Sequence, residues 1–270
     1  MTGRPGIVLH YDDGGPGDRG PAAADTPMIL VHGWLGSADA WSAQLPLLRS
    51  RRRAVAVDLR GHGGSPTPGH GYGAADLAAD LAATVEHLGI RPVVVVGHSM
   101  GASAATVLAV RRPDLVRALV LIDPDYAGDP AGRAQLQAIA DRPNDEAVHA
   151  GVIELFARRI DAATASAQLR DRHRREVMAM SPEVVTASLL ANLDDPSSIR
   201  FRPAAEPVLA RRTQPVLSFH RDPERARLEE ALATHLASRA VLVPGAGHWI
   251  HQEQVGLVDA ETERWLADLD

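Results

Sequence analysis

The sequence predicts an α/β protein that has a mostly parallel sheet with helices on both of its faces. Short apolar runs rich in β-branched residues alternate with longer segments in which apolar residues recur every three or four positions. The runs 93–96 (VVVV) and 118–122 (ALVLI) contain no polar residue, as is typical of strands that a parallel sheet buries on both faces. The alternation is interrupted once, between about residues 132 and 209, where helical spacing continues without a convincing strand.

The first half of the chain contains most of the expected strands. In the segment 74–88, leucine and valine recur at helical spacing, and Gly89 is typical of a residue that ends a helix. Asp39 is suited to begin a helix as its N-cap, and Pro113 ends the helix that begins at Ser99. The expected elements, in order, are strand 7–11, a loop over 12–27, strand 28–31, helix 39–48, strand 54–59, helix 74–88, strand 93–96, helix 99–112 and strand 118–122.

The C-terminal part of the chain resumes the same alternation. Asp222 and Pro223 suit the N-cap and the first position of an expected helix 223–236. The other expected elements are strand 216–219, strand 240–243 and helix 255–269. We therefore expect a core domain made of residues 1–130 and 210–270, and a helical cap (lid) domain made of residues 131–209.

The composition excludes several classes of protein. The 270 residues carry a net charge of −6 and their basic residues form no stripe, so nucleic acid is not an expected partner. The chain has no cysteine, which excludes disulfides and thiolate chemistry. It shows neither a signal-peptide pattern nor an apolar run of membrane-spanning length, so we expect a cytoplasmic protein without membrane contacts.

The stretch VVVVGHSMGAS (93–103) places a serine between two glycines, at the point where a buried strand becomes a helix. Such a turn is sharp, and Gly97 and Gly101 leave room for the neighbouring backbone. The amide groups at the start of the helix favour negative charge that develops beside the serine. These features predict that Ser99 is a catalytic nucleophile.

A serine hydroxyl needs a general base, usually a histidine that a carboxylate orients. Among the 12 histidines, His248 is the candidate base. It follows the last expected strand in VLVPGAGHWIHQE and lies near the C-terminus, in the chain order serine, acid, histidine. His251 is the neighbouring alternative, while structural roles are expected for His32 and His62.

A tetrahedral intermediate also needs backbone N–H donors for its oxyanion. Met100 follows the nucleophile and supplies one amide, and Trp34, in the loop after strand 28–31, is expected to supply the other. Gly33 gives that loop unusual backbone freedom. The candidate substrate-binding residues are Gly33, Trp34, Tyr126 and Trp249, whose aromatic members indicate an apolar or aromatic substrate.

Together these motifs resemble the α/β-hydrolase fold superfamily. The matching stretches are LVHGWLGSADAW, AVAVDLRGHGGS, VVVVGHSMGAS, RALVLIDP and VPGAGHWIHQEQ. The resemblance implies an eight-stranded, mostly parallel sheet, a Ser-His-acid triad, and a cap domain in the helical insertion. The serine at position 99 argues against the dehalogenase and epoxide-hydrolase branches, which resemble the chain in cap and motifs but use an aspartate there.

The acid of the implied triad has two main candidates. Most relatives place it in a G-x-x-D loop after the strand that follows the cap, where this chain has Asp222 but lacks the glycine. Asp222 also suits the N-cap of the next helix. Some branches place the acid after the preceding strand, where Asp123 stands. We favour Asp123 over Asp222, with Asp125 as a third option.

The expected activity is hydrolysis of a small carboxylic ester or lactone through an acyl-enzyme intermediate, with no metal and no organic cofactor. Carbon–carbon bond hydrolases, hydroxynitrile lyases and perhydrolases also resemble this pattern, because they use the same triad for other chemistry. A ligand-binding receptor of the same fold is a further alternative.

Overall fold

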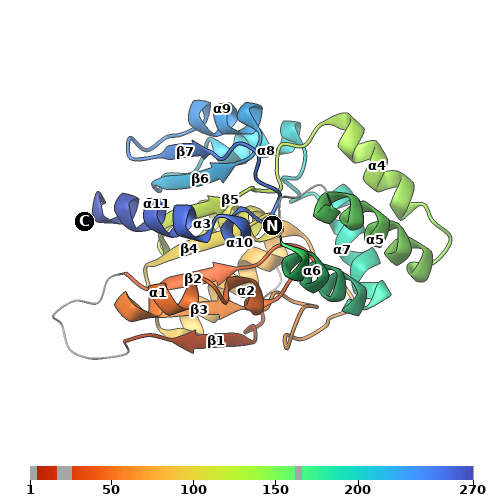
Figure 1. Ribbon diagram of the computed structural model, residues 1–270, viewed down its shortest axis with the longest axis horizontal. Helices are drawn as coiled ribbons and strands as arrows, with labels where there is room; N and C mark the ends of the chain where they lie inside the picture. The colour runs from red at the N-terminus through yellow and green to blue at the C-terminus, as the bar shows by residue number, and fades with distance from the viewer. Residues whose placement is uncertain (1–4, 17–25, 162–165, 270) are drawn as a thin grey trace.

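The computed structural model describes residues 5–16, 26–161 and 166–269, which form one sheet with helices around it (Figure 1). In this part of the chain the sheet has seven strands in the order β1-β3-β2-β4-β5-β6-β7. β1 is antiparallel to β3, and every other neighbouring pair is parallel. The strands are β1 (Tyr11–Gly14), β2 (Met28–Val31), β3 (Ala54–Val57), β4 (Val93–His98), β5 (Val116–Ile122), β6 (Val216–His220) and β7 (Arg239–Leu242). The mostly parallel α/β sheet is confirmed, but the described residues contain no eighth strand.

The helices alternate with the strands in the predicted order. They are a 3-10 helix η1 (Ala38–Trp41), α1 (Leu45–Arg51), α2 (Ala74–Leu88), α3 (Met100–Arg111), α4 (Pro130–Ala140), α5 (Asp145–Asp161), α6 (Ala167–Ala179), α7 (Pro182–Asp194), α8 (Arg202–Leu209), α9 (Pro223–Ala231), α10 (Ile250–Glu253) and α11 (Val255–Ala267). Helix α2 has the predicted bounds, and Gly89 ends it in the left-handed conformation with a φ of 64°.

The predicted strand 7–11 is wrong. The backbone N–H of Ile7 donates to Asp80 Oδ1 at 2.8 Å, and the N–H of Leu9 donates to Thr84 Oγ1 at 3.0 Å. Because side chains of α2 use these donors, pairing with β3 begins only at Tyr11.

Two predicted helices have bounds that differ from the observed ones by more than two residues. The segment 39–48 divides into η1 and α1, because Pro46 lies in the first turn of α1 and cannot donate to a preceding helical turn. Asp39 lies inside η1, so it is not the N-cap. The helix predicted over 223–236 ends at Ala231, and Leu236 beyond it is fully exposed, so a longer helix would bury no further apolar face there.

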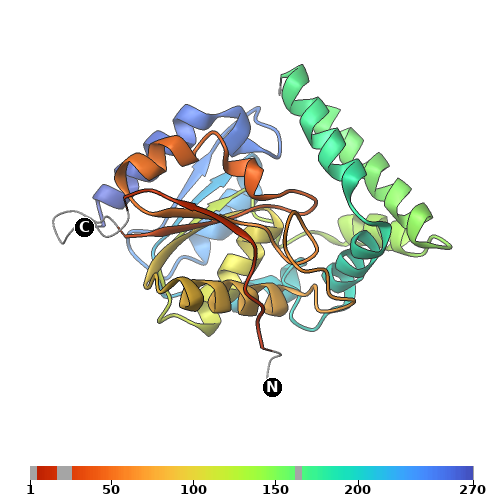
Figure 2. The ribbon, with the colours of Figure 1, turned by 90° about the horizontal axis from the view of Figure 1, so that it is seen from below.

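Alternate residues along each strand pack against different helices. Met28 and Leu30 of β2 belong to one buried cluster with α1 and α11, whereas Ile29 and Val31 belong to a second with α2 and α3. Figure 2 shows α1 and α11 on one side of the sheet and α2 and α3 on the other. The central strands β2 to β5 are therefore buried on both faces, which explains their long apolar runs.

Helices α4 to α7 form a group beside the sheet, between β5 and β6 in the sequence (Figures 1 and 2). Within this group α5 contacts α6 and α7, and α4 contacts α7. The last helix of the predicted insertion, α8, packs instead on α3 and buries Ala205 and Leu209 there. No helix in the described residues has both the length and the apolar content that crossing a bilayer requires.

Candidate active site

Ser99 lies in the turn between β4 and α3, in a conformation that residues other than glycine rarely adopt. Its φ is 52° and its ψ is −116°. A Cβ at Gly97 would lie 2.7 Å from the Cα of Ala102, and a Cβ at Gly101 would lie 2.4 Å from the carbonyl oxygen of Val31. The two glycines are therefore needed for the close approach of strand, turn and helix that forms this elbow.

Three of the predicted site residues meet beyond the ends of β4, β5 and β7. The hydroxyl Oγ of Ser99 lies 2.9 Å from His248 Nε2, and His248 Nδ1 lies 2.5 Å from Asp123 Oδ2. All three are buried, with exposed fractions of 4%, 7% and 4% in that order. The serine can donate its proton to Nε2 while Nδ1–H donates to the carboxylate, an arrangement suited to general-base activation of a hydroxyl.

Asp123 is positioned by backbone and side-chain contacts together. It adopts a φ of 38°, and its N–H donates to the Phe219 carbonyl of β6 at 2.8 Å. Its Oδ2 also accepts a hydrogen bond from Arg221 Nε at 2.9 Å. Burial alone would raise the pKa of Asp123, but the hydrogen bond and charge of His248, together with Arg221, hold this pKa at about 2. The carboxylate is therefore ionised at neutral pH.

The two other candidate acids occupy different places. Asp222 is the exposed N-cap of α9, where its Oδ1 accepts from the Glu224 amide at 2.8 Å. The carboxylate of Asp125 pairs with the guanidinium of Arg200. The structure thus brings Asp123 to His248 and gives Asp222 the capping role that its sequence context also suggested.

Buried histidines and Trp249 surround His248. The Nε2–H of His98 donates to the His248 carbonyl at 2.9 Å, with the two ring centroids 4.7 Å apart. His173 of α6 stacks on Trp249 at 4.0 Å, and its Nε2 lies 2.7 Å from Gln252 Oε1. Burial lowers the pKa of His98 well below its usual value, and it lowers the pKa of His173 to about 4. These rings are therefore neutral supports at neutral pH.

The loop after β2 lies against the elbow. A Cβ at Gly33 would lie 3.0 Å from Ser99 Cβ and 2.7 Å from His98 Nδ1, so only glycine fits there. His32 holds this loop, because its Nδ1–H donates to the Gly33 carbonyl at 2.7 Å. Met100 is the first residue of α3, and helix N-termini leave their first amides without an intrahelical acceptor. The loop and the helix therefore both bring backbone close to Ser99.

Aromatic side chains connect this loop to the inserted helices. The Trp34 ring lies 5.7 Å from the ring of Phe156 in α5, and Phe156 lies 6.3 Å from Trp249. The indole Nε1–H of Trp34 donates to Ser188 Oγ of α7 at 2.8 Å. Trp34 and Trp249 therefore line the space between the elbow and helices α5 to α7.

The structure places Tyr126, a predicted substrate-binding residue, in a buried polar network. Its hydroxyl donates to Glu229 Oε2 at 2.5 Å, and Arg212 Nη2 donates to Glu229 Oε1 at 2.5 Å. Burial raises the pKa of Tyr126 well above its usual value, so the phenol stays protonated. This network joins residues far apart in the sequence, so sequence spacing contained no signal for it.

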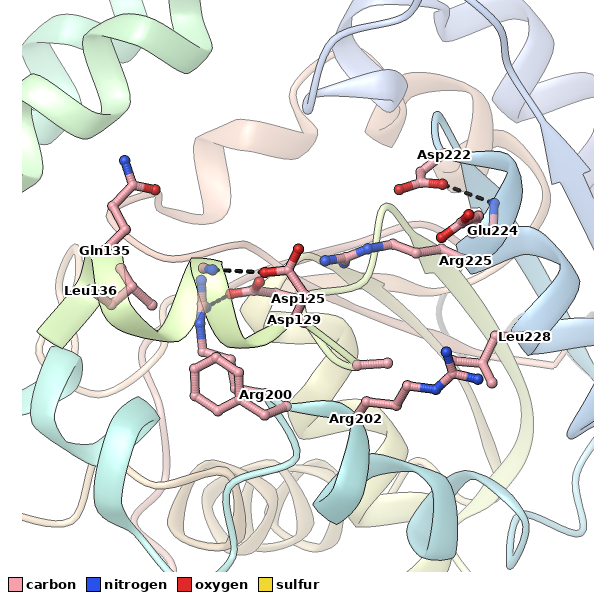
Figure 3. A pocket seen from close by; sticks show the side chains of 14 residues that line it. Asp125, Asp129, Gln135, Leu136, Arg200, Arg202, Asp222, Glu224, Arg225 and Leu228 are labelled. Carbon is pink, nitrogen blue, oxygen red and sulfur yellow. Dashed lines mark hydrogen bonds and ion pairs between the residues drawn. The ribbon is translucent and has the colours of Figure 1, made fainter.

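A polar pocket, whose lining residues are drawn in Figure 3, lies against the loop after β5 that carries Asp123. Its volume is about 210 Å³, and its lining comes from the loop after β5, the start of α4, residues 200–202 and the start of α9. Figure 3 shows Asp125 next to Arg200, and Arg225 extending towards them from α9. Ser99 and His248 do not line this pocket, so it adjoins the triad without containing it.

Metal ligands do not gather in the part of the chain that the structure describes. No group of three or more histidine, aspartate or glutamate side chains there is arranged to hold an ion. The short distances from His248 to Ser99 and to Asp123 are hydrogen bonds between side chains.

Comparison with known proteins gives one family and several relatives. A model of the alpha/beta hydrolase fold matches residues 26–175. The chain is 44% identical over 102 residues to a non-heme haloperoxidase of Rhodococcus erythropolis, covering 37% of this chain and 34% of that protein. It is 40% identical over 125 residues to a bifunctional esterase/perhydrolase of Acinetobacter calcoaceticus, covering 45% and 43%. Each match thus spans less than half of the curated relative.

A solved structure resembles nearly the whole chain. This is a thermophilic esterase from Thermogutta terrifontis, with a TM-score of 0.77 and 26% identity over 96% of this chain and 93% of that one.

Proposed function

Because the chain belongs to the alpha/beta hydrolase fold family, we propose that it is a serine hydrolase that cleaves a carboxylic ester or lactone. One observation carries this proposal, the hydrogen-bonded chain from Ser99 Oγ to His248 and on to Asp123. The esterase relatives support the same activity. A receptor of this fold would not need a buried, ionised carboxylate on the imidazole.

In the first step, the Ser99 oxygen attacks the substrate carbonyl carbon as His248 Nε2 takes the hydroxyl proton. Asp123 holds the imidazole in the tautomer with its proton on Nδ1 and stabilises the imidazolium. The Met100 and Trp34 amides would bind the oxyanion. The alcohol then leaves with the proton from Nε2, and Ser99 carries the acyl group.

In the second step, water attacks the acyl-enzyme while His248 takes one of its protons. The tetrahedral intermediate then breaks the bond to Ser99, and Nε2 returns a proton to the serine oxygen. The products are the carboxylic acid and the free enzyme, so the cycle needs no metal or organic cofactor.

The substrate is expected to be a small molecule with an apolar or aromatic group near the carbonyl. The rings of Trp34, Phe156 and Trp249 pack in a row beside His248, and such aromatic side chains favour an apolar ligand group. Ester and lactone carbonyls need only the oxyanion donors and the triad as polar partners.

We also propose that residues 131–209 act as a cap. Helices α5 and α6 place Phe156 and His173 against Trp249, and the triad is less than one-tenth exposed. Substrate entry would therefore require α5 and α6 to move away from Trp249. Because α8 packs on α3, we expect the moving part to end before α8.

Perhydrolysis is the second candidate, because the Acinetobacter relative is a bifunctional esterase/perhydrolase. Hydrogen peroxide would attack the acyl-enzyme in place of water, giving a peroxy acid and free Ser99. The triad, oxyanion amides and first step would be unchanged.

The test is product analysis with aryl esters and lactones, using wild type and Ser99→Ala. We expect wild type to release acid and alcohol and Ser99→Ala to lose nearly all turnover, while its unfolding curve stays close to wild type. Adding hydrogen peroxide separates the two candidates, because only a perhydrolase forms peroxy acid. Equal turnover by both proteins would rule out the serine mechanism.

A further inference from the structure

Three arginines hold the loop that carries the acid, one at each of its residues. Arg221 Nε donates to Asp123 Oδ2 at 2.9 Å, Arg225 Nη1 donates to the Pro124 carbonyl at 3.0 Å, and the guanidinium of Arg200 pairs with the Asp125 carboxylate. Only the first of these contacts reaches the carboxylate that faces His248. Arg221 directly follows β6, in the region where most relatives were expected to place the acid itself.

Arg221 and His248 share one oxygen atom. Both Arg221 Nε and His248 Nδ1 contact Oδ2 of Asp123, at 2.9 and 2.5 Å. We propose that Arg221 is a positioning residue, which fixes the Asp123 carboxylate on His248 and sets the pH at which Ser99 becomes reactive. This inference rests on the proposed function, because it assigns Arg221 a part in activating the same serine.

The arginine acts on the imidazole through charge as well as geometry. An ionised carboxylate stabilises the imidazolium, and a guanidinium on the same oxygen partly offsets that effect. His248 therefore releases its proton at a lower pH when Arg221 is present, which keeps the base ready to accept the serine proton. Nε also limits rotation of the carboxylate away from Nδ1.

Several other ionisable groups lie near the pair of Arg221 and His248. Buried histidines from the neighbouring elements face the imidazole or the carboxylate: His98 of β4, His173 of α6, His220 of β6 and His251 of α10. Burial lowers the pKa of each one, to about 4 at His173 and about 3 at His251, so each ring loses its proton at a lower pH than a free imidazole. Charged side chains near these rings include the carboxylates Asp222, Glu229 and Glu253 and the arginines Arg172, Arg200 and Arg225.

The alternative is that Arg221 makes only a surface ion pair. Its side chain is 45% exposed, whereas that of Asp123 is 4% exposed, and exposed ion pairs contribute little to stability. A purely structural contact would alter the unfolding curve and leave the pH dependence of serine reactivity in place. The pH dependence therefore distinguishes the two roles.

The experiment measures the second-order rate at which a fluorophosphonate labels the full chain between pH 5 and pH 9. In this reaction Ser99 Oγ forms a bond to phosphorus, fluoride leaves, and His248 takes the serine proton. The variants are Arg221→Gln, which removes the charge, and Arg221→Lys, which keeps it. Arg227→Gln is the matched control, because Arg227 is an exposed arginine on helix α9, which begins two residues after Arg221.

We expect the acid limb of the Arg221→Gln profile to move about half a pH unit towards higher pH, which is the size expected for a solvent-screened charge at this range. At pH values below this limb, Arg221→Gln should be labelled about threefold more slowly than wild type, because half a pH unit changes the fraction of unprotonated His248 by about that factor. Arg221→Lys and Arg227→Gln should keep the wild-type limb. Should Arg221→Gln fail to fold, Arg221→Met carries the same expectation.

Three results would overturn the inference in different ways. If wild type reacts and the Arg221→Gln profile superimposes on it, Arg221 does not position the acid, although the proposed function stands. If wild type takes up no label at any pH, the proposed function fails, and the role of Arg221 fails with it. An equal shift in Arg227→Gln would likewise overturn the inference, because any lost charge would then suffice.

Discussion

Replacing Asp123 by asparagine should remove most of the serine reactivity. An asparagine side chain can turn its amide N–H towards Nδ1, which leaves the imidazole proton on Nε2, where it can no longer accept from Ser99. The Nδ1–Oδ2 distance is 2.5 Å and Asp123 is 4% exposed, so water has little room to replace the lost acceptor. We expect kcat/KM on an aryl ester to fall about 10³- to 10⁴-fold, equivalent to about 4 to 5.5 kcal/mol of transition-state stabilisation.

Asp222→Asn is the matched control for this loss. Asparagine caps a helix about as well as aspartate, so the α9 cap and the activity should both survive. Both variants should be assayed with the same ester at pH 7 to 8, with unfolding curves to show that each is folded. If Asp222→Asn loses activity and Asp123→Asn retains it, the assignment of the acid to the loop after β5 is refuted.

Three further outcomes follow from the geometry. Contacts in the folded chain depress the pKa of Asp123 from 3.8 to about 2. The ionised carboxylate therefore stabilises the fold above pH 4, and this contribution to the free energy of unfolding decreases as the pH falls towards 2. The stability gap between wild type and Asp123→Asn in urea should thus narrow by about 1 kcal/mol between pH 6 and pH 3, and an unchanged gap would contradict this. Gly101→Ala places a methyl group 2.4 Å from a β2 carbonyl oxygen and should lower the free energy of unfolding by about 1 to 3 kcal/mol, while Gly69→Ala, with open space around it, should change it little. Trp34→Phe loses the hydrogen bond to Ser188 and should cost about 1 kcal/mol in urea unfolding. Its labelling rate should still stay within about threefold of wild type, because the backbone amide is unchanged and phenylalanine keeps an apolar ring at this position; a much slower rate would show that the indole takes part.

The fold and the sharp turn at Ser99 could be predicted because their signals are local. Apolar runs and helical spacing predicted the order of the elements, and the elbow requires glycines at fixed positions around Ser99. The first strand was misplaced because Asp80 and Thr84, more than seventy residues further along the chain, bind the backbone donors of residues 7 and 9. No local pattern indicates such a contact.

The sequence could not indicate which aspartate contacts His248, because Asp123 and Asp222 each follow an expected strand. The contact with His248 depends on the positive φ of Asp123 and on the hydrogen bond from its N–H to the Phe219 carbonyl of the neighbouring strand. Both features depend on how β5 and β6 lie together in the folded chain. Asp222 gave a second signal, its suitability as an N-cap, and in the structure it has that role.

The surroundings of His248 depend on long-range packing. His173 reaches Trp249 only because α6 lies over the site, and Tyr126 turns towards Glu229, 103 residues away. The sequence position of Arg221 was a weak indication of its contact with the acid, because it directly follows β6, close to where an acid was expected. Its contact with Asp123 still depends on the pairing of β5 with β6.

The most direct measurement identifies which side chain reacts. The full chain is treated with a fluorophosphonate, digested, and examined by peptide mass spectrometry to locate the adduct. The geometry of the elbow and the imidazole predicts one adduct, on Ser99, and a rate at least about a hundredfold slower when His248 is replaced by asparagine. An adduct on any other residue, or the same rate without the imidazole, would contradict the central claim that His248 activates Ser99.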